Sequence, residues 1–306
     1  MLLDDRETLI LAVLILFTGK YINKRINFLR TYNIPEPVTG GILASLLICV
    51  IYISFNFTIN FSLSQRDSLL VVFFTCVGLS SRFSTLLKGG KPLIILLIAA
   101  VSYLFIQNLT GMGAAFLTGL DTHRGLIGGS VALSGGHGTA IAWAPTFIKD
   151  YNITNAMEIG IACATFGLVL GGVAGGPIAN FLIKKHNLKC TSKEKISVGI
   201  SDPKEEKISI ENLYSFVLIL CVAIGIGIYL HDLLIKIGIQ LPIFVPCLFG
   251  GILLTNTIPI IWKTTNWPTG KPVLALVSNY SLGLFLAMSL MSLQLWTLVN
   301  LALPII

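Results

Sequence analysis

Charged side chains are scarce in this sequence. Of its 306 residues, 11% are Asp, Glu, Lys or Arg, whereas 54% are apolar and the mean hydropathy is +0.84. A typical soluble domain is about 25% charged, so the composition excludes that class and predicts an all-α polytopic membrane protein. The net charge of +7 is spread over short loops and is not gathered on one basic face. We therefore expect no nucleic-acid partner.

Cysteine and histidine are also few, and neither shows the spacing of a reactive or metal-binding site. The six cysteines include no CxxC pair, which gives no indication of a zinc site or a disulfide framework. The four histidines show no metal-ligand spacing, and the HExxH and GxSxG patterns of zinc proteases and serine hydrolases are absent. We expect neither an enzyme nor a cofactor.

Long apolar runs are what the sequence has in abundance, and a helix needs about 20 such residues to cross a membrane. The predicted spans are residues 8–22, 37–56, 68–87, 92–115, 156–183, 212–230, 239–261 and 273–292, followed by the beginning of a ninth before Ile306. Residues 185–210 are rich in lysine and indicate a solvated linker. This linker divides the chain into a five-span part, 1–184, and a partial second part, 211–306.

Lysine and arginine orient the predicted spans. If the linker is cytoplasmic, sixteen of the 21 basic residues lie on the cytoplasmic side. The positive-inside rule then places the N-terminus outside. Because five spans is an odd number, a repeat of the first part would enter the membrane in the opposite direction, as in the inverted repeats of many transporters.

A weak internal repeat agrees with this arrangement. An offset of 210 residues places GGIL at 40–43 on GGIL at 250–253, and FFTCVGLSSRF at 73–83 on GLFLAMSLMSL at 283–293. One offset thus aligns the second and third spans of both parts. We therefore predict an internal duplication.

Residues 119–146 are apolar overall but are interrupted by glycine pairs and by Ser, Thr and His. Irregular backbone survives inside a membrane only when it is buried in protein or lines a wet cavity, so we predict a re-entrant loop here. A helix beginning at Thr139 or Ala140 would direct N–H groups and its positive dipole end toward an anion. The alternative is an extracellular loop. The candidate substrate- and sodium-binding residues are Ser134, Gly135, Gly136, His137, Gly138 and Thr139.

Charged residues stand at the start of this loop, where Asp121 and Arg124 flank His123. Arg124 is a candidate for steering an anion toward the loop, because a guanidinium pairs well with carboxylates. The alternative is that these residues form only a solvated outer mouth.

Five segments together resemble the bacterial sodium/glutamate symporter family. They are IPEPVTGG at 34–41, FFTCVGLSSRF at 73–83, SGGHGTAIAWAP at 134–145, GGPIA at 175–179 and FLAMSLMSLQLW at 285–296. The resemblance implies a homodimer in the bacterial inner membrane that carries L-glutamate together with sodium by alternating access, with no cofactor. It also implies two inverted five-span domains, each with a re-entrant loop whose tip contributes to one substrate and sodium site. It assigns no individual sodium ligand.

The end of the chain departs from this pattern. By the 210-residue offset, the second re-entrant loop would lie beyond residue 306. The second repeat is therefore expected to be truncated, with half of the site outside the chain.

Other transport functions stay open at this point. A carrier of another small organic anion would use the same loop, and a channel would use it as a filter. A sodium/proton antiporter would need carboxylates at mid-membrane, and the predicted spans contain only Glu158, at the end of one span.

Overall fold

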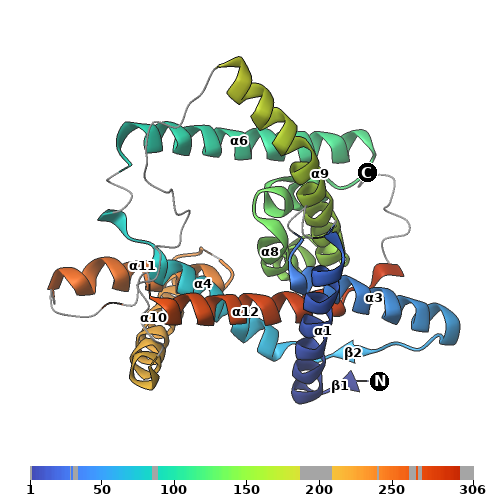
Figure 1. The fold of residues 1–306 in the computed structure, drawn as a ribbon, viewed down its shortest axis with the longest axis horizontal. Coiled ribbons are helices and arrows are strands. Elements are labelled where there is room, and N and C mark those ends of the chain that lie inside the picture. Colours follow the sequence, from blue (N-terminus) through green and yellow to red (C-terminus); the bar gives the residue numbers. More distant parts are fainter. Residues whose placement is uncertain are drawn as a thin grey trace. The chain divides into compact units, whose positions relative to one another are not determined.

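The computed structural model describes residues 2–27, 29, 34–84, 89–186, 209–239, 241–261, 267 and 271–296. Helices dominate this part of the chain (Figure 1). The long helices are α1 (Asp5–Arg25), α3 (Glu36–Phe55), α4 (Ser64–Ser80), α6 (Gly90–Leu117), α9 (Ala156–Lys185), α10 (Ile210–Lys236), α11 (Phe244–Ile261) and α12 (Pro272–Met291). Between α6 and α9 lie α7 (Thr122–Leu126), the π-helix η1 (Ile127–Val131) and α8 (Gly136–Tyr151).

Each of the eight predicted spans overlaps one of the long helices, although the predicted span 68–87 extends beyond the end of α4 and the predicted span 239–261 begins before α11. Within the described ranges, four helices are long and apolar enough to cross a membrane, namely α3, α6, α10 and α12. Shorter apolar stretches lie within α9 (Ala156–Gly167) and α11 (Phe244–Pro259). These helices confirm the prediction of an all-α membrane protein. Most of the predicted linker and the beginning of the ninth span lie outside the described residues.

The start of α1 is fixed by hydrogen bonds. The Asp4 carboxylate accepts from the backbone N–H of Arg6 and Glu7, and the Glu7 carboxylate accepts from the N–H of Asp4. This reciprocal capping box satisfies N–H groups that have no partner inside the helix. The adjacent Asp5 accepts from the hydroxyls of Ser62 and Ser64, which lowers its pKa.

Two short strands tie this region to the chain that follows α3. β1 (Leu2–Leu3) pairs in parallel with β2 (Asn60–Phe61). The N-terminus is thereby held beside the segment that connects α3 to α4.

The described residues form two compact units, each assembled from distant parts of the chain. Unit 1 contains residues 1–64, 99–195 and 286–306, and unit 2 contains residues 65–98 and 196–285. The boundaries fall inside α6 and α12, so these two helices contribute to both units.

In unit 1, glycines bring helix backbones into close contact. A Cβ on Gly19 of α1 would collide with the carbonyl oxygen of Glu36, and one on Gly40 of α3 would collide with that of Ile15. The other side of α3 meets the end of α12, where a Cβ on Gly41 would overlap the side chain of Leu290. Small residues thus let α1, α3 and the end of α12 pack closely.

Unit 2 repeats this arrangement with other helices. A Cβ on Gly250 of α11 would collide with the carbonyl oxygen of Ala223 in α10, and one on Gly227 of α10 would overlap the backbone of Cys247. On its other side α11 meets α4, because a Cβ on Gly251 would lie 2.7 Å from the carbonyl oxygen of Thr75.

A buried polar contact supports the core of unit 2. The indole Nε1 of Trp267 donates to the hydroxyl of Thr255 (3.1 Å), which itself donates to the carbonyl of Leu79 (2.9 Å). The side chain of Trp267 packs with Phe216 and Leu220 of α10 in the same apolar cluster.

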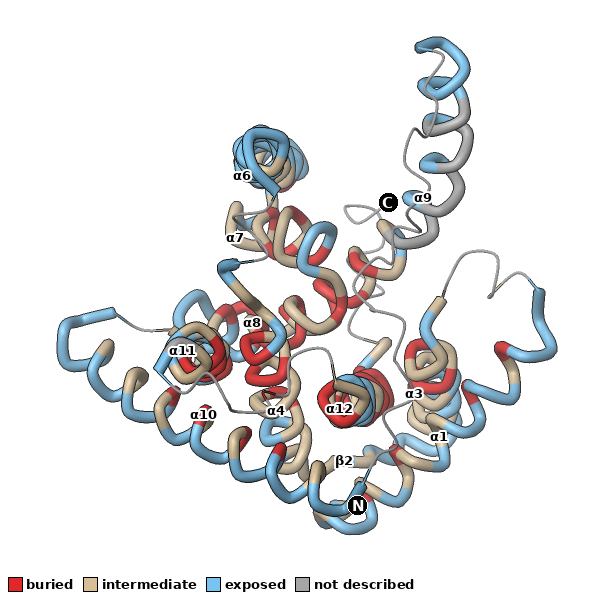
Figure 2. Tube along the Cα trace, turned by 60° about the vertical axis from the view of Figure 1, so that its left-hand side comes forward, coloured by how far each residue is buried: buried red, intermediate tan, exposed pale blue. Residues whose placement is uncertain are grey.

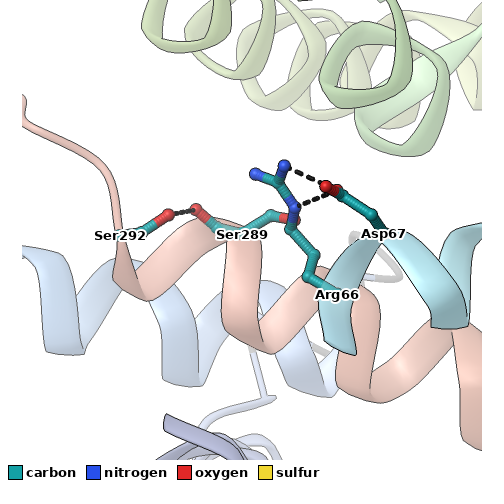
Figure 3. A network of polar contacts seen from close by, with 4 residues as sticks. All are labelled: Arg66, Asp67, Ser289 and Ser292. Atoms are coloured by element: carbon teal, nitrogen blue, oxygen red, sulfur yellow. Dashed lines mark hydrogen bonds and ion pairs between the residues drawn. The ribbon is translucent and has the colours of Figure 1, made fainter. Parts of the chain in front are cut away.

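Polar groups at two helix ends are satisfied locally (Figure 3). In the first turn of α4, the guanidinium of Arg66 forms an ion pair with Asp67, with 2.6 Å between Nη2 and Oδ1. Just after α12, the hydroxyl of Ser292 donates to the carbonyl of Ser289 (2.9 Å).

The surface of α6 differs from that of the other long helices because it is exposed along most of its length (Figure 2). Its exposed side chains are mainly apolar and include Ile94, Leu96, Ile98 and Phe105. An apolar exposed helix of this kind suits contact with lipid.

Candidate functional site

The predicted re-entrant segment folds as a helical hairpin, which we define as residues 122–151. Its first leg consists of α7 and η1, and its second leg is α8. The two ends of the hairpin meet, because the ring of His123 stacks on the ring of Tyr151 with 4.1 Å between their centroids. The chain therefore goes out along one leg and returns along the other.

The turn between the legs depends on glycine. The tip, which we define as residues 134–139, begins with Ser134 and Gly135 in the turn itself. Gly136 has φ +73°, in the left-handed region that glycine adopts most readily. A Cβ on Gly135 would lie 2.5 Å from the carbonyl oxygen of Val131 and 2.6 Å from Cβ of Thr139. The two consecutive glycines thus serve separate needs, one steric and one conformational.

Helix α8 begins earlier than the sequence indicates. We expected it to start at Thr139 or Ala140, and it starts at Gly136. The left-handed Gly136 reverses the chain within one residue, so the following residues can already adopt helical angles. The first N–H groups of a helix have no intrahelical partner, and α8 has no side-chain cap at its start. Its N-terminus therefore suits an anion.

His137 is anchored to α9 instead of standing free at the tip. Its side chain is buried, and Nε2 lies 2.9 Å from the hydroxyl oxygen of Thr165. That hydroxyl donates its single proton to the carbonyl of Ile161 (2.9 Å), so Nε2 of His137 must be the donor toward Thr165. This hydrogen bond fixes the position of the imidazole ring through Nε2.

Amide side chains of α6 hold the first leg and the tip. The hydroxyl of Ser134 donates to Oε1 of Gln107 (2.5 Å), and the backbone N–H of Ser130 donates to Oδ1 of Asn108 (2.9 Å). The backbones approach closely further along, because a Cβ on Gly111 would collide with the carbonyl of Gly125. The tip is thus supported by α6 on one side and by α9 on the other.

Gln107, Asn108 and Thr165 were not among the site residues predicted from the sequence. A detectable signal existed for the first two, because they are adjacent amide side chains within a predicted span that carries no charge. Buried amides are expected to find hydrogen-bond partners. Thr165 offered no such signal, since single threonines are common in membrane helices.

Arg124 lines a small cavity at the start of the hairpin. The cavity has a volume of about 140 Å³, and its other lining residues include Gly111, Ala115, Thr118, Gly128 and Cys163. The Nε atom of Arg124 is buried and has no hydrogen-bond partner in the described part of the chain. Such an unsatisfied donor is costly to bury and would gain from an anionic partner.

The neighbouring Asp121 is engaged by His123. Its carboxylate accepts from the backbone N–H of His123 (2.8 Å) and lies 2.6 Å from Nδ1 of the ring. These two hydrogen bonds, the backbone one first, lower the pKa of Asp121. The structure therefore separates the three polar side chains of the loop start into an Asp121–His123 pair and a cavity-lining Arg124.

Comparisons with known proteins give a consistent result. The family model for the sodium/glutamate symporter matches residues 1–306. A protein of Haemophilus influenzae with the name sodium/glutamate symporter is 39% identical over 305 residues, which are 98% of this chain and 75% of the relative. A protein of the same name from Escherichia coli is 41% identical over 315 residues, covering 99% of this chain and 76% of the relative. No solved structure matches the chain.

Proposed function

Because the chain belongs to the sodium/glutamate symporter family, we propose that it moves glutamate across a membrane together with sodium by alternating access. The family match over the whole chain is the observation that carries this proposal. Membership of a family of transporters also confirms that the chain is not an enzyme, and sodium acts in this family as a coupling ion and not as a cofactor.

The tip supports a role in binding the substrate. Glutamate carries two carboxylates, and the uncapped N-terminus of α8 offers backbone N–H groups with the positive end of the helix dipole. The six predicted residues from Ser134 to Thr139 include the first turn of this helix and the turn before it. Arg124, with its unsatisfied Nε, would attract the anion at the start of the hairpin.

The dimensions of the hairpin support a re-entrant position. α8 has 16 residues, and a rise of 1.5 Å per residue makes it about 24 Å long, which is shorter than the roughly 30 Å hydrocarbon core. The first leg combines two five-residue helices and is shorter still. Neither leg suffices to cross the membrane, and the ends of the two legs meet at the His123–Tyr151 stack.

Helix packing supports the inverted repeat, with 1–184 and 211–306 as its two parts and 185–210 as the linker. In each part the first helix packs on the second through glycines, α1 on α3 and α10 on α11. The contact of Gly40 with Ile15 has its counterpart in that of Gly250 with Ala223. Gly40 and Gly250 are also related by the 210-residue offset, and their partners Ile15 and Ala223 lie 208 positions apart, so a similar contact recurs in both parts.

The third helix of each proposed repeat contacts the second helix of the other. α3 of the first part packs on the end of α12 through Gly41 and Leu290, whereas α11 of the second part packs on α4 through Gly251 and Thr75. Unit 1 therefore combines α1 and α3 with the end of α12, whereas unit 2 combines α10, α11 and the rest of α12 with α4.

For the cellular setting, we extend the proposal to a homodimer in the bacterial inner membrane with the N-terminus outside. The distribution of basic residues supports the orientation. The exposed apolar surface of α6 suits lipid or a second copy of the chain.

Uptake of labelled L-glutamate into proteoliposomes tests the proposed function. We expect accumulation above the external concentration when sodium is higher outside, and none when potassium replaces sodium. Accumulation of a different organic anion would retain the mechanism and change the substrate. Uptake that only equilibrates glutamate, with no response to the sodium gradient, would refute symport and favour a channel.

A further inference from the structure

A polar pocket in unit 2 lies where α10 and α12 begin, and the proposed glutamate site does not use it. The pocket has a volume of about 200 Å³. Three of its polar side chains, Glu211, Asn212 and Ser215, come from the first two turns of α10. The fourth, Lys271, stands directly before the first residue of α12. The pocket therefore combines an acid, a base, an amide and a hydroxyl.

The apolar part of the lining belongs to the core of unit 2. Phe216 of α10 and Val273 of α12 line the pocket together with Ile219. Phe216 and Val273 are both buried members of one apolar cluster. Because the two residues pack in the same cluster, the starts of α10 and α12 keep a fixed spacing, and the polar groups around the pocket do so as well.

The two charges of the pocket have opposite signs but do not pair. Among the described residues, neither Glu211 nor Lys271 forms an ion pair. Glu211 stands in the first turn of α10, where the helix dipole favours an acid, whereas the dipole of α12 disfavours the half-buried Lys271 at its N-terminus. An anion beside Lys271 would remove this conflict. It would also accept from the first N–H groups of α12, which have no partner inside the helix.

The α10 side of the pocket suits an ammonium group. Glu211 and Ser215 are four positions apart, so they lie on the same face of α10. A carboxylate and a hydroxyl oxygen both accept hydrogen bonds from an ammonium. The pocket thus offers acceptors on one wall and donors on the other, with no net charge, which fits a zwitterion better than a simple anion.

The pocket opens at the level where lipid headgroups lie. The predicted spans of these two helices begin at residues 212 and 273, next to the pocket. Tyr214 of α10 is 71% exposed, and tyrosine is typical of the membrane–water interface. One turn further along α10, Leu218 is 66% exposed and suits contact with acyl chains.

We propose that this pocket binds the headgroup of phosphatidylethanolamine, a zwitterionic phospholipid. Its phosphate lies beside Lys271, and its primary ammonium donates to Glu211 and Ser215. A free amino acid is also a zwitterion, but the exposed apolar surface of α10 at Leu218 adjoins the pocket level and provides a place for lipid chains. This binding goes beyond the proposed transport function and does not depend on it.

Native mass spectrometry of the detergent-purified protein tests the proposal, with added lipids that have identical acyl chains. Phosphatidylethanolamine should bind about fivefold or more tightly than phosphatidylcholine, because the quaternary ammonium of the latter has no N–H to donate to Glu211. Glu211→Gln should lose this preference. Lys271→Gln should weaken the binding of both lipids to a similar extent, because both carry the phosphate.

Matched controls come from the other end of the same helix. Asp232→Asn and Lys236→Gln each remove an exposed charge of α10, and both should bind phosphatidylethanolamine like the wild type. Ser215→Ala removes one acceptor of the ammonium, so it should reduce the preference in part and provides a second test if Glu211→Gln does not fold.

Three outcomes would overturn the proposal. A preference for phosphatidylethanolamine that is unchanged in Glu211→Gln and Ser215→Ala would place the lipid elsewhere. Tighter binding of phosphatidylglycerol than of phosphatidylethanolamine by the wild type would show a site for anions alone. Displacement of the bound lipid by free L-glutamate in the wild type, with no such competition in Glu211→Gln, would assign the pocket to the amino acid. Failure of sodium-driven uptake would refute the symport function and would leave the lipid measurement unaffected.

Discussion

Replacing Gly136 with alanine isolates the conformational requirement of the tip. A Cβ at this position meets no atom within 4 Å, so the substitution causes no steric clash. Its φ of +73° is nevertheless unfavourable for alanine, by about 1 to 2 kcal/mol for a residue with a Cβ. We therefore expect the tip conformation that starts α8 at Gly136 to become about 5- to 30-fold less populated.

The assay is sodium-driven uptake of glutamate at low substrate concentration, where the rate is proportional to kcat/KM. Gly136→Ala should lower this value by about 5- to 30-fold. Gly136→Asn should lower it less, because asparagine tolerates the left-handed region better than alanine. The matched control is Gly113→Ala in α6, which also meets no atom within 4 Å but has ordinary helical angles, and uptake should be unchanged. Equal uptake by Gly136→Ala and Gly113→Ala would refute the reasoning.

Further predictions concern helix packing, the hairpin start and pH. Gly40→Ala and Gly250→Ala should each lower the free energy of unfolding by about 1 to 3 kcal/mol, because the added methyl group collides with a neighbouring backbone carbonyl. Chemical denaturation measures this free energy. A loss of stability at only one of the two positions would contradict the proposed repeat. Arg124→Gln should raise the KM for glutamate about tenfold with little change in kcat, because one contact with the anion is lost. A fall in kcat with an unchanged KM would contradict the proposal that Arg124 attracts the anionic substrate. The pKa of Asp121 is lowered in the folded state by hydrogen bonds from His123, so its stabilisation is present above about pH 4 and is lost as the pH falls further. Asp121→Asn should accordingly have a lower melting temperature than wild type at neutral pH, and the difference should disappear at low pH; a constant difference would contradict this assignment.

The helices were predictable from the sequence because burial in a membrane requires continuous apolar runs, and these runs are local features. The hairpin was also visible, because glycine pairs and polar residues interrupt such a run at 119–146. The exact start of α8 was missed by three residues. Either of two consecutive glycines can adopt a left-handed conformation, and only the structure assigns it to Gly136.

Contacts between distant residues could not be predicted in the same way. Nothing in the sequence pairs His137 with Thr165 or Ser134 with Gln107, because each partner lies in an apolar helix whose rotation is set by packing. The sequence likewise places Glu158 at the end of a predicted span, and its burial depends in part on residues 293–295, which are far away in the chain. Identical glycine pairs in α3 and α11 indicated a duplication, but they did not indicate that each of these helices contacts the third helix of the other part.

The contact between α3 and the end of α12 bears on how the protein is made. Gly41 of α3 meets Leu290 of α12, and a ribosome that adds about 5 to 20 residues per second delivers α12 roughly ten seconds to a minute after α3. Throughout that interval Gly41 of α3 lacks its partner. The early helices therefore stay incompletely packed, either in the membrane or beside the insertion machinery, until α12 is synthesised. The late arrival of α12 completes unit 1, and interruption of synthesis before this point would leave a product that quality-control proteases can recognise.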